Sequence, residues 1–202
     1  DSVWNVDPKH VDIYVKVNEG KKYYIRNISW VGNTVYSTDY LSRLLGMKKG
    51  DVYNQTYLSK RLSQDEDAVG NEYWNNGYLF YRLEPTEVNI VGDSIDLEMR
   101  ITEGQQAHIN RVKINGNDRL YENVVRRELR TKPGDLFSKE ALQRSARELA
   151  SMGYFDPEAI NPVPEPNYED GTVDINYNLK QKSNDQVELS LGWGQTGVIG
   201  RV

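Results

Sequence analysis

The stretch VDIYVKVNEG at residues 11–20 returns as IDLEMRITEG at residues 95–104 and, in altered form, as VDINYNLKQK at residues 173–182. In each copy apolar residues alternate with polar ones. A period of two predicts a strand with one buried face and one solvent-facing side. The chain therefore carries three related strands, and the third lacks the Glu-Gly ending of the first two.

The residues between the copies also recur, at an offset of 84 positions. After each Glu-Gly comes another strand-like run, at residues 23–31 and 107–115, which ends in Gly-Asn. Gly-Asp at residue 50 recurs at residue 134, each time before an apolar-aromatic pair. Several landmarks in one order and at one offset indicate an internal duplication.

Between these landmarks the hydrophobic period becomes helical. Short helices are expected at residues 37–45 and 120–130, each followed by a longer helix. Asn54 and Ser138 can cap the longer helices, because their side-chain oxygens accept from free N–H groups of the first turn. The longer helices are expected to end at Gly77 and Gly153. Residues 58–77 span 19 positions and residues 142–153 span 11, so the first helix is predicted to be 8 residues longer.

Each repeat thus reads strand, helix, helix, strand, strand. The last two strands are expected to form an antiparallel hairpin, and the first strand to pair in parallel with the third through the helical crossover. The sequence predicts an α+β fold with two tandem β-α-α-β-β modules, each a three-stranded mixed sheet covered by two helices. The third strand should be central and the second an open edge. The predicted core includes Leu97, Ile175, Ile28 and Val112.

Composition excludes several classes of function. A net charge of −5 argues against nucleic acid, and the absence of cysteine removes thiolate metal sites and disulfides. His10 and His108 are the only histidines, and His108 is predicted to be a partly buried strand residue rather than a ligand. The G-x-G-x-x-G pattern at residues 192–197 lacks the following helix that dinucleotide binding needs. No catalytic constellation emerges, so neither an enzyme nor a cofactor is expected.

The order of the Gly-Asn, Gly-Asp-aromatic and Gly-Tyr landmarks resembles the POTRA domains of BamA-type outer-membrane assembly factors. The resemblance covers residues 20 to about 200, and residues 116–130 are similar to the POTRA domain that precedes the barrel. It implies the last two POTRA domains of such a factor. The longer helix of the first repeat and the proline-rich edge of the second depart from the family pattern.

This resemblance suggests a division of the chain. Residues 1–20 would be the last strand of a preceding POTRA module, 21–103 a module with an extended second helix, and 104–182 the membrane-proximal module. Residues 183–202 would begin the first barrel strand. There, apolar residues alternate with polar ones from residue 187 to 194, which fits either a barrel strand or an ordinary amphipathic strand; the resemblance favours the barrel.

The resemblance also implies a function. The chain would be a scaffold on the periplasmic face of the bacterial outer membrane, binding unfolded β-barrel clients and a BamD-type lipoprotein. It would reach the membrane through a C-terminal barrel that this sequence does not contain. The alternative is the POTRA region of a two-partner secretion or translocation pore of the same superfamily. At least three modules are expected from the copy at residues 11–20, which favours assembly.

Three groups of residues are candidates for these roles. An edge strand can take up an extended peptide, and proline blunts an edge. The second repeat carries four prolines in its edge segment and the first only Pro85, so residues 79–90 are the predicted client edge. A hinge of restricted range is expected between the repeats. The candidates are Leu79, Phe80, Tyr81, Leu83 and Val88 for clients, Arg126, Arg127, Glu128 and Arg130 for the lipoprotein, and Glu103 and Gly104 for the hinge.

Overall fold

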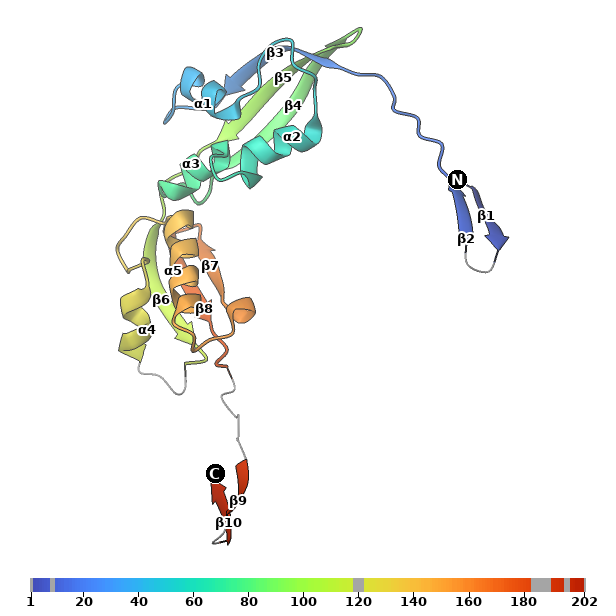
Figure 1. Ribbon diagram of the computed structural model, residues 1–202. Helices are drawn as coiled ribbons and strands as arrows, with labels where there is room; N and C mark the ends of the chain where they lie inside the picture. The colour runs from blue at the N-terminus through green and yellow to red at the C-terminus, as the bar shows by residue number, and fades with distance from the viewer. Residues whose placement is uncertain (1, 8–9, 118–121, 183–189, 195–196, 202) are drawn as a thin grey trace. The chain divides into compact units, whose positions relative to one another are not determined.

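The computed structural model describes residues 2–7, 10–117, 122–182, 190–194 and 197–201 (Figure 1). The chain forms two compact units. The first unit comprises residues 1–70 and 82–103, and the second comprises residues 71–81 and 104–202. The second unit thus includes residues 71–81, which belong to the first repeat by sequence.

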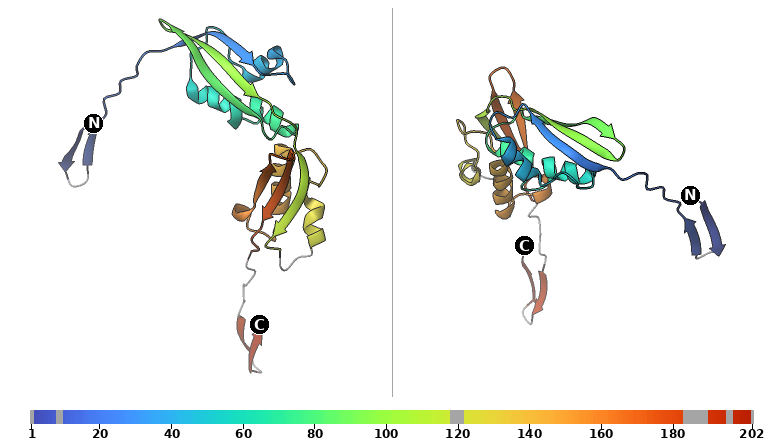
Figure 2. Two further views of the ribbon diagram at one scale, coloured as in Figure 1. Left: turned by 180° about the vertical axis from the view of Figure 1, so that it is seen from behind. Right: turned by 90° about the horizontal axis from the view of Figure 1, so that it is seen from above.

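The first unit is built on a three-stranded sheet. The parallel pair β3–β5 and the antiparallel pair β4–β5 place β5 in the centre, as predicted. Figures 1 and 2 show helices on one face of this sheet. The elements are β3 (Tyr24–Val31), α1 (Thr38–Leu45), α2 (Gln55–Ser59), the π-helical η1 (Lys60–Gln64), the start of α3 (Val69–Asn75), β4 (Arg82–Val91) and β5 (Ser94–Thr102).

The core of this unit lies between β5 and the helices. Alternate residues of β5 are buried, namely Ile95, Leu97, Met99 and Ile101, and they face a helical layer that buries Leu41, Leu45 and Leu58. The predicted core residue Leu97 is confirmed, at 1% exposure. Ile28, on β3, is only half-buried, so its assignment to the core was wrong.

The prediction of one long helix in the first repeat is wrong. A π-helical turn and the non-helical residues 65–68 divide it into α2, η1 and α3. Arg61 holds this break, because its guanidinium pairs with Asp65 at 3.1 Å and Asp67 at 2.6 Å. The same group donates to the carbonyls of Leu44 and Leu45 at the end of α1. The acids at residues 65–67 therefore form a turn instead of a solvated helix face.

The second unit repeats this architecture. Its sheet has β8 in the centre, parallel to β6 and antiparallel to β7. The side chains of Ile175 and Val112 are buried, as predicted, whereas His108 is exposed and was wrongly expected to be partly buried. The elements after the end of α3 are β6 (His108–Asn115), α4 (Glu122–Glu128), α5 (Lys139–Ser151), the 3-10 helix η2 (Pro157–Ala159), β7 (Asn161–Asn167) and β8 (Thr172–Asn178).

Local signals explain most element boundaries. The side chains of Asn54 and Ser138 accept from the N–H groups of Tyr57 and Ala141 at 3.0 and 3.2 Å, so both predicted N-caps are confirmed. Gly32 in the Gly-Asn landmark has φ +90°, and a Cβ there would lie 2.0 Å from the carbonyl oxygen of Ile101. Only glycine lets the chain pass this close to the end of β5.

Outside the two repeats, the chain forms two antiparallel hairpins. One joins β1 (Ser2–Asp7) to β2 (His10–Tyr14), and the other joins β9 (Ser190–Gly194) to β10 (Gly197–Arg201). The expected barrel strand falls partly on residues 183–189, which lie outside the described residues, and its assignment stays a prediction. Among the described residues, none of the helices combines the length and the apolar character needed to cross a membrane.

Candidate functional site

The predicted client edge begins later than expected. Strand β4 starts at Arg82, so Leu79, Phe80 and Tyr81 lie before it and their assignment to the edge was wrong. The N–H groups of Tyr78 and Tyr81 donate to carbonyls within residues 73–78, which bends this segment into turns. An aromatic run favours strands locally, but here its side chains are needed for packing.

All three residues are at least half-buried. Leu79 and Phe80 pack against the core of the second unit, and Tyr81 is 6% exposed and stacks on Tyr73 with ring centroids 4.3 Å apart. Burial raises the pKa of the Tyr81 phenol, whose oxygen has no hydrogen-bond partner among the described residues. Tyr81 is therefore a packing residue and is not available to a guest strand.

Leu83 and Val88, in contrast, do lie on β4. Leu83 is half-buried opposite Ile101, and Val88 is 46% exposed at a bulge between Glu87 and Asn89. Beyond the bulge, Ile90 is 52% exposed. The edge that β4 offers therefore runs along residues 82–91 and is apolar toward its end.

The two edge strands differ in their free N–H groups. In an antiparallel strand, alternate residues direct their N–H groups to opposite sides. Pro162, Pro164 and Pro166 alternate along β7, and the β7–β8 pairing is continuous over all seven residues of β7. The three absent N–H groups therefore lie on the open side. β4 contains a single proline, Pro85, so its open side keeps backbone N–H donors that β7 lacks.

A groove lies beside this open edge. One open pocket of about 430 Å³ lies between α2 and β4 and is lined by Leu58, Pro85, Thr86 and neighbouring residues. A second cavity of about 560 Å³ lies toward the hairpin end of β4, lined by Tyr23, Val52, Tyr53, Asn54, Gln55, Thr56, Glu87, Ile90 and Ile95. Tyr53, Gln55 and Glu87 line both.

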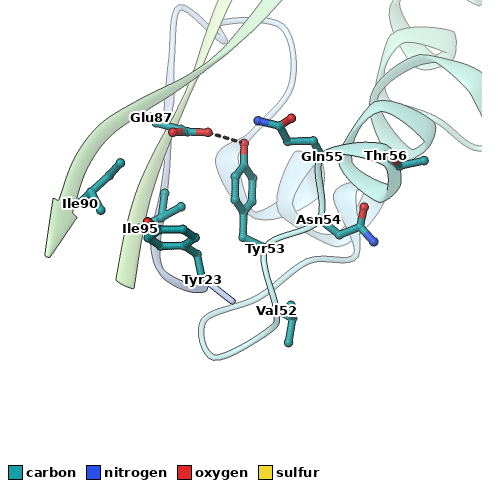
Figure 3. A pocket seen from close by; sticks show the side chains of 9 residues that line it. All are labelled: Tyr23, Val52, Tyr53, Asn54, Gln55, Thr56, Glu87, Ile90 and Ile95. Carbon is teal, nitrogen blue, oxygen red and sulfur yellow. Dashed lines mark hydrogen bonds between the residues drawn. The ribbon is translucent and has the colours of Figure 1, made fainter. Parts of the chain in front are cut away.

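A hydrogen bond crosses the groove where the two cavities meet. The Tyr53 hydroxyl donates to the Glu87 carboxylate at 2.8 Å, which links the start of α2 to β4 (Figure 3). Burial, reinforced by this carboxylate, raises the pKa of Tyr53. The sequence did not single out this pair. The sequence offers one signal for this pair. Tyr53 matches Phe137 at the repeat offset and carries a hydroxyl that Phe137 lacks.

The predicted lipoprotein face is partly neutralised by its own unit. Arg126 donates to Glu122 at 2.8 Å and to the carbonyl of Val112 at 3.1 Å. Arg130 lies beyond the end of α4 and forms a bidentate pair with Glu148 at 2.9–3.0 Å, which raises the pKa of Arg130.

The remaining two candidates are free to contact a partner. Within the described part of the chain, the side chains of Arg127 and Glu128 form no hydrogen bond or ion pair. The charge of Glu128 nevertheless adds to the effect of Glu148 in raising the pKa of Arg130. Arg127 is exposed and Glu128 is half-buried, both on α4. The structure therefore brings the four predicted residues onto one stretch but leaves only this pair uncommitted.

The predicted hinge residues fall at the boundary between the two units. Glu103 ends the first unit and Gly104 opens the second. Glu103 is 8% exposed, and its carboxylate accepts from the backbone N–H groups of Thr34 and Val35 at 2.8 and 3.0 Å. The glutamate of the Glu-Gly motif thus anchors the loop after the first strand of its own repeat, and a hinge at Glu103 and Gly104 stays a prediction.

Comparison with known proteins places the chain in a family. Residues 23–104 and 107–182 each match the POTRA family, described as "Surface antigen variable number repeat". A BamA from Neisseria meningitidis serogroup B is 30% identical over 96% of this chain, and a putative outer membrane protein assembly factor from Treponema pallidum is 27% identical over 94%. The chain spans 24% and 22% of these two relatives, respectively.

Solved structures agree on the fold. The POTRA3-5 crystal structure of Haemophilus influenzae BamA matches with a TM-score of 0.70 and 20% identity, over 89% of this chain and 70% of that one. A Haemophilus ducreyi BamA lacking POTRA domains 1-3 matches with a TM-score of 0.67 and 22% identity, over 87% of this chain and 33% of that one. Two β-α-α-β-β repeats with these landmarks and matches identify the chain as a member of the POTRA family, a POTRA region of the BamA type.

Proposed function

We propose that this POTRA region serves the assembly of outer-membrane proteins from the periplasmic face of the bacterial outer membrane. It would hold unfolded β-barrel clients along β4 and dock a BamD-type lipoprotein against α4. The relatives named as assembly factors support the general role. The observation that carries the client proposal is the difference between the open β4 edge and the β7 edge with its three prolines.

The β4 edge suits many different clients. A guest strand gains main-chain hydrogen bonds that do not depend on its sequence. Pro85 is exposed and lines the neighbouring groove, so it offers apolar contact to guest side chains that point toward the groove. Nascent barrel strands alternate apolar and polar residues, and this pattern fits an edge with a groove on one side.

The client proposal is tested by photo-crosslinking in cells with the full-length protein. A crosslinker replaces Val88, and a matched one replaces Val163 on β7; their side chains are 46% and 36% exposed. We expect Val88 to capture several different nascent barrel proteins and Val163 to capture few. Changing Pro162, Pro164 and Pro166 to valine should raise capture at Val163, because it restores three N–H groups.

Two results would count against the client proposal. Equal or stronger capture at Val163 in the unaltered protein would show that the open edge of β4 is not what clients select. Capture of one dedicated substrate at Val88 would favour the secretion or translocation alternative over assembly.

The lipoprotein proposal rests on Arg127 and Glu128, the two charged residues of α4 whose side chains form no hydrogen bond or ion pair in the described part of the chain. A charge reversal at an interface penalises pairing with a complementary partner. Glu128→Lys should therefore weaken lipoprotein binding about tenfold, equivalent to about 1.4 kcal/mol. The measurement is a calorimetric titration of the full-length protein, with Glu169→Lys as the control because Glu169 is exposed in the turn between β7 and β8. Unchanged affinity of the Glu128 variant would remove α4 as the docking face.

A further inference from the structure

Residues 71–81, here called the connector, are seated on the start of the second repeat. The carbonyl of Gly77 accepts from the N–H of Ala107 at 2.8 Å, and the Asn75 side chain accepts from the N–H of Glu140 at 2.9 Å. Gly77 also lies against the side chain of Leu136. All these residues belong to the second unit. The connector thus satisfies backbone donors of the repeat that follows it.

Four residues of the second repeat that contact the connector are here called the seat; they are Ala107, Leu136, Lys139 and Glu140. Lys139 adds a charged contact to this seat. A cation in the first turn of a helix opposes the helix dipole, so its presence needs another reason. The Lys139 ammonium donates to Asn71 Oδ1 at 2.8 Å and lies 4.7 Å from the centre of the Trp74 ring. The side chains of Asn71 and Trp74 therefore offset the unfavourable position of the lysine charge at the start of the helix.

The first unit presents the same seat, built from the same scaffold. Tyr53 N–H donates to the Tyr23 carbonyl at 2.8 Å, as Phe137 N–H donates to the Ala107 carbonyl at 2.9 Å. At the repeat offset, Tyr23, Val52, Gln55 and Thr56 match the seat residues Ala107, Leu136, Lys139 and Glu140. All four matching residues line the cavity of about 560 Å³ (Figure 3).

This cavity lacks the partners that fill the seat in the second unit. The N–H of Tyr23 has no acceptor among the residues that the structure describes, whereas its counterpart at Ala107 is bonded to the connector. Val52 is 50% exposed beside it. A backbone donor next to an exposed apolar side chain calls for a partner that supplies a carbonyl and apolar contact.

We infer that the cavity is a socket for the connector of a preceding repeat. The last strand of such a repeat would be the copy at residues 11–20, whose Glu-Gly ending stands three residues before Tyr23. Gly104 stands three residues before Ala107 in the same way. The occupant is a helix end that presents a free glycine carbonyl to Tyr23 and a side-chain amide to Thr56. This goes beyond the proposed function and leaves the groove at Pro85 and Thr86 open to clients.

The two sockets differ in charge at one matched position, Gln55 against Lys139. Lys139 requires an acceptor and an aromatic face from its connector, whereas the matching Gln55 is uncharged and requires neither. The connector of the preceding repeat therefore does not need the counterparts of Asn71 and Trp74. The two sockets therefore make different demands on the connectors that occupy them.

The test compares the full-length protein with the 202-residue chain. The 202-residue chain has no cysteine, so Val52→Cys provides a single thiol there, and mass spectrometry locates the label in the longer protein. Maleimide should label Val52→Cys at least tenfold more slowly in the full-length protein. The control is Val31→Cys, at 51% exposure and at the other end of β3, which should react equally in both.

Hydrogen exchange provides a second readout that needs no substitution. The amide of Tyr23 should be protected in the full-length protein and exchange freely in the 202-residue chain, while the amide of Ala107 is protected in both. Equal labelling of Val52→Cys in the two proteins, or equal exchange at Tyr23, would overturn the inference. Because the exchange measurement uses the unaltered sequence, it decides the matter even if the cysteine variant folds poorly.

Discussion

The edge strands β4 and β7 have diverged, while the central strands they pair with have stayed alike. β5 and β8 bury every second residue in the same pattern. β4 is ten residues long, carries one proline and is interrupted by a bulge. β7 is seven residues long and carries three prolines on one side. The buried residues of the central strands have stayed similar in the two repeats because they pack against the core. The edge strands could diverge because few contacts depend on their free side.

The largest effect should come from the shared core. Leu97→Ala on β5 removes a side chain that is 1% exposed, and we expect a loss of about 2–5 kcal/mol in the free energy of unfolding. Val88→Ala on the β4 edge, at 46% exposure, should cost less than about 0.5 kcal/mol. Urea denaturation measures both. A loss at Leu97 as small as that at Val88 would refute the division into conserved centre and free edge.

A smaller effect is expected from the glycines that let strands and loops approach. Gly32→Ala must move a Cβ away from a carbonyl oxygen only 2.0 Å off, in addition to the strain of φ +90°. Gly50 has φ +93° with nothing within 4 Å of its Cβ position, so Gly50→Ala carries the backbone strain alone, about 1 kcal/mol. We expect Gly32→Ala to destabilise the protein by about 1 kcal/mol more. Equal costs would mean that the close approach to Ile101 relaxes freely.

The next comparison concerns two buried tyrosines. Tyr177 replaces the Met99 of the first repeat at the centre of the sheet, and its hydroxyl bonds to Thr131 at 2.7 Å. Tyr177→Phe should cost about 1–2 kcal/mol, because it leaves the buried Thr131 hydroxyl with one partner fewer. Tyr81→Phe should be neutral or slightly stabilising, since the Tyr81 hydroxyl is buried and has no hydrogen-bond partner in the described part of the chain. A clear loss of thermal stability in the Tyr81 variant would reveal a partner for that hydroxyl.

The smallest effect is a pH dependence on the solvent face of the first sheet. Arg26 binds Asp96 through two hydrogen bonds and lowers the pKa of that carboxyl below its usual value. The stabilisation is therefore present above the unfolded pKa and is lost as the pH falls through the lowered folded pKa. Arg26→Gln should be less stable than the unaltered protein at pH 6, and the two should converge toward pH 2. A difference that persisted in acid would assign the effect to packing of the arginine stem.

Much of the fold followed from short signals in the sequence. Alternation in the three copies predicted the central strands, and the side chains of Asn54 and Ser138 predicted two helix starts, because each depends on its nearest neighbours alone. The break after η1 did not follow, since no proline or glycine marks residues 60–69 and Arg61 creates the turn through distant carbonyls. Tyr81 was likewise predicted to be a strand residue, because its aromatic neighbours favour a strand locally. The turn before β4 depends on tertiary packing, which the local sequence does not show.

The candidate site was harder to predict than the fold. The prolines of β7 predicted an edge with few N–H donors, since proline lacks an N–H in any context. The pair Tyr53 and Glu87 joins residues that are 34 positions apart and has no local pattern. Arg126 pairs with Glu122 one helical turn away, which a local pattern can suggest, whereas the pairing of Arg130 depends on Glu148, a residue on another helix.

The connector has a consequence for how such genes can be recombined. A cassette cut at Gly104 would carry the second repeat without Asn71, Asn75 and Gly77, and would leave Lys139 and the amide of Ala107 without their partners. A cassette that begins at residue 71 keeps these contacts but divides α3. Natural shuffling of single repeats between genes would therefore meet a barrier at this junction, and pairs of adjacent repeats should be inherited together more often than either repeat alone.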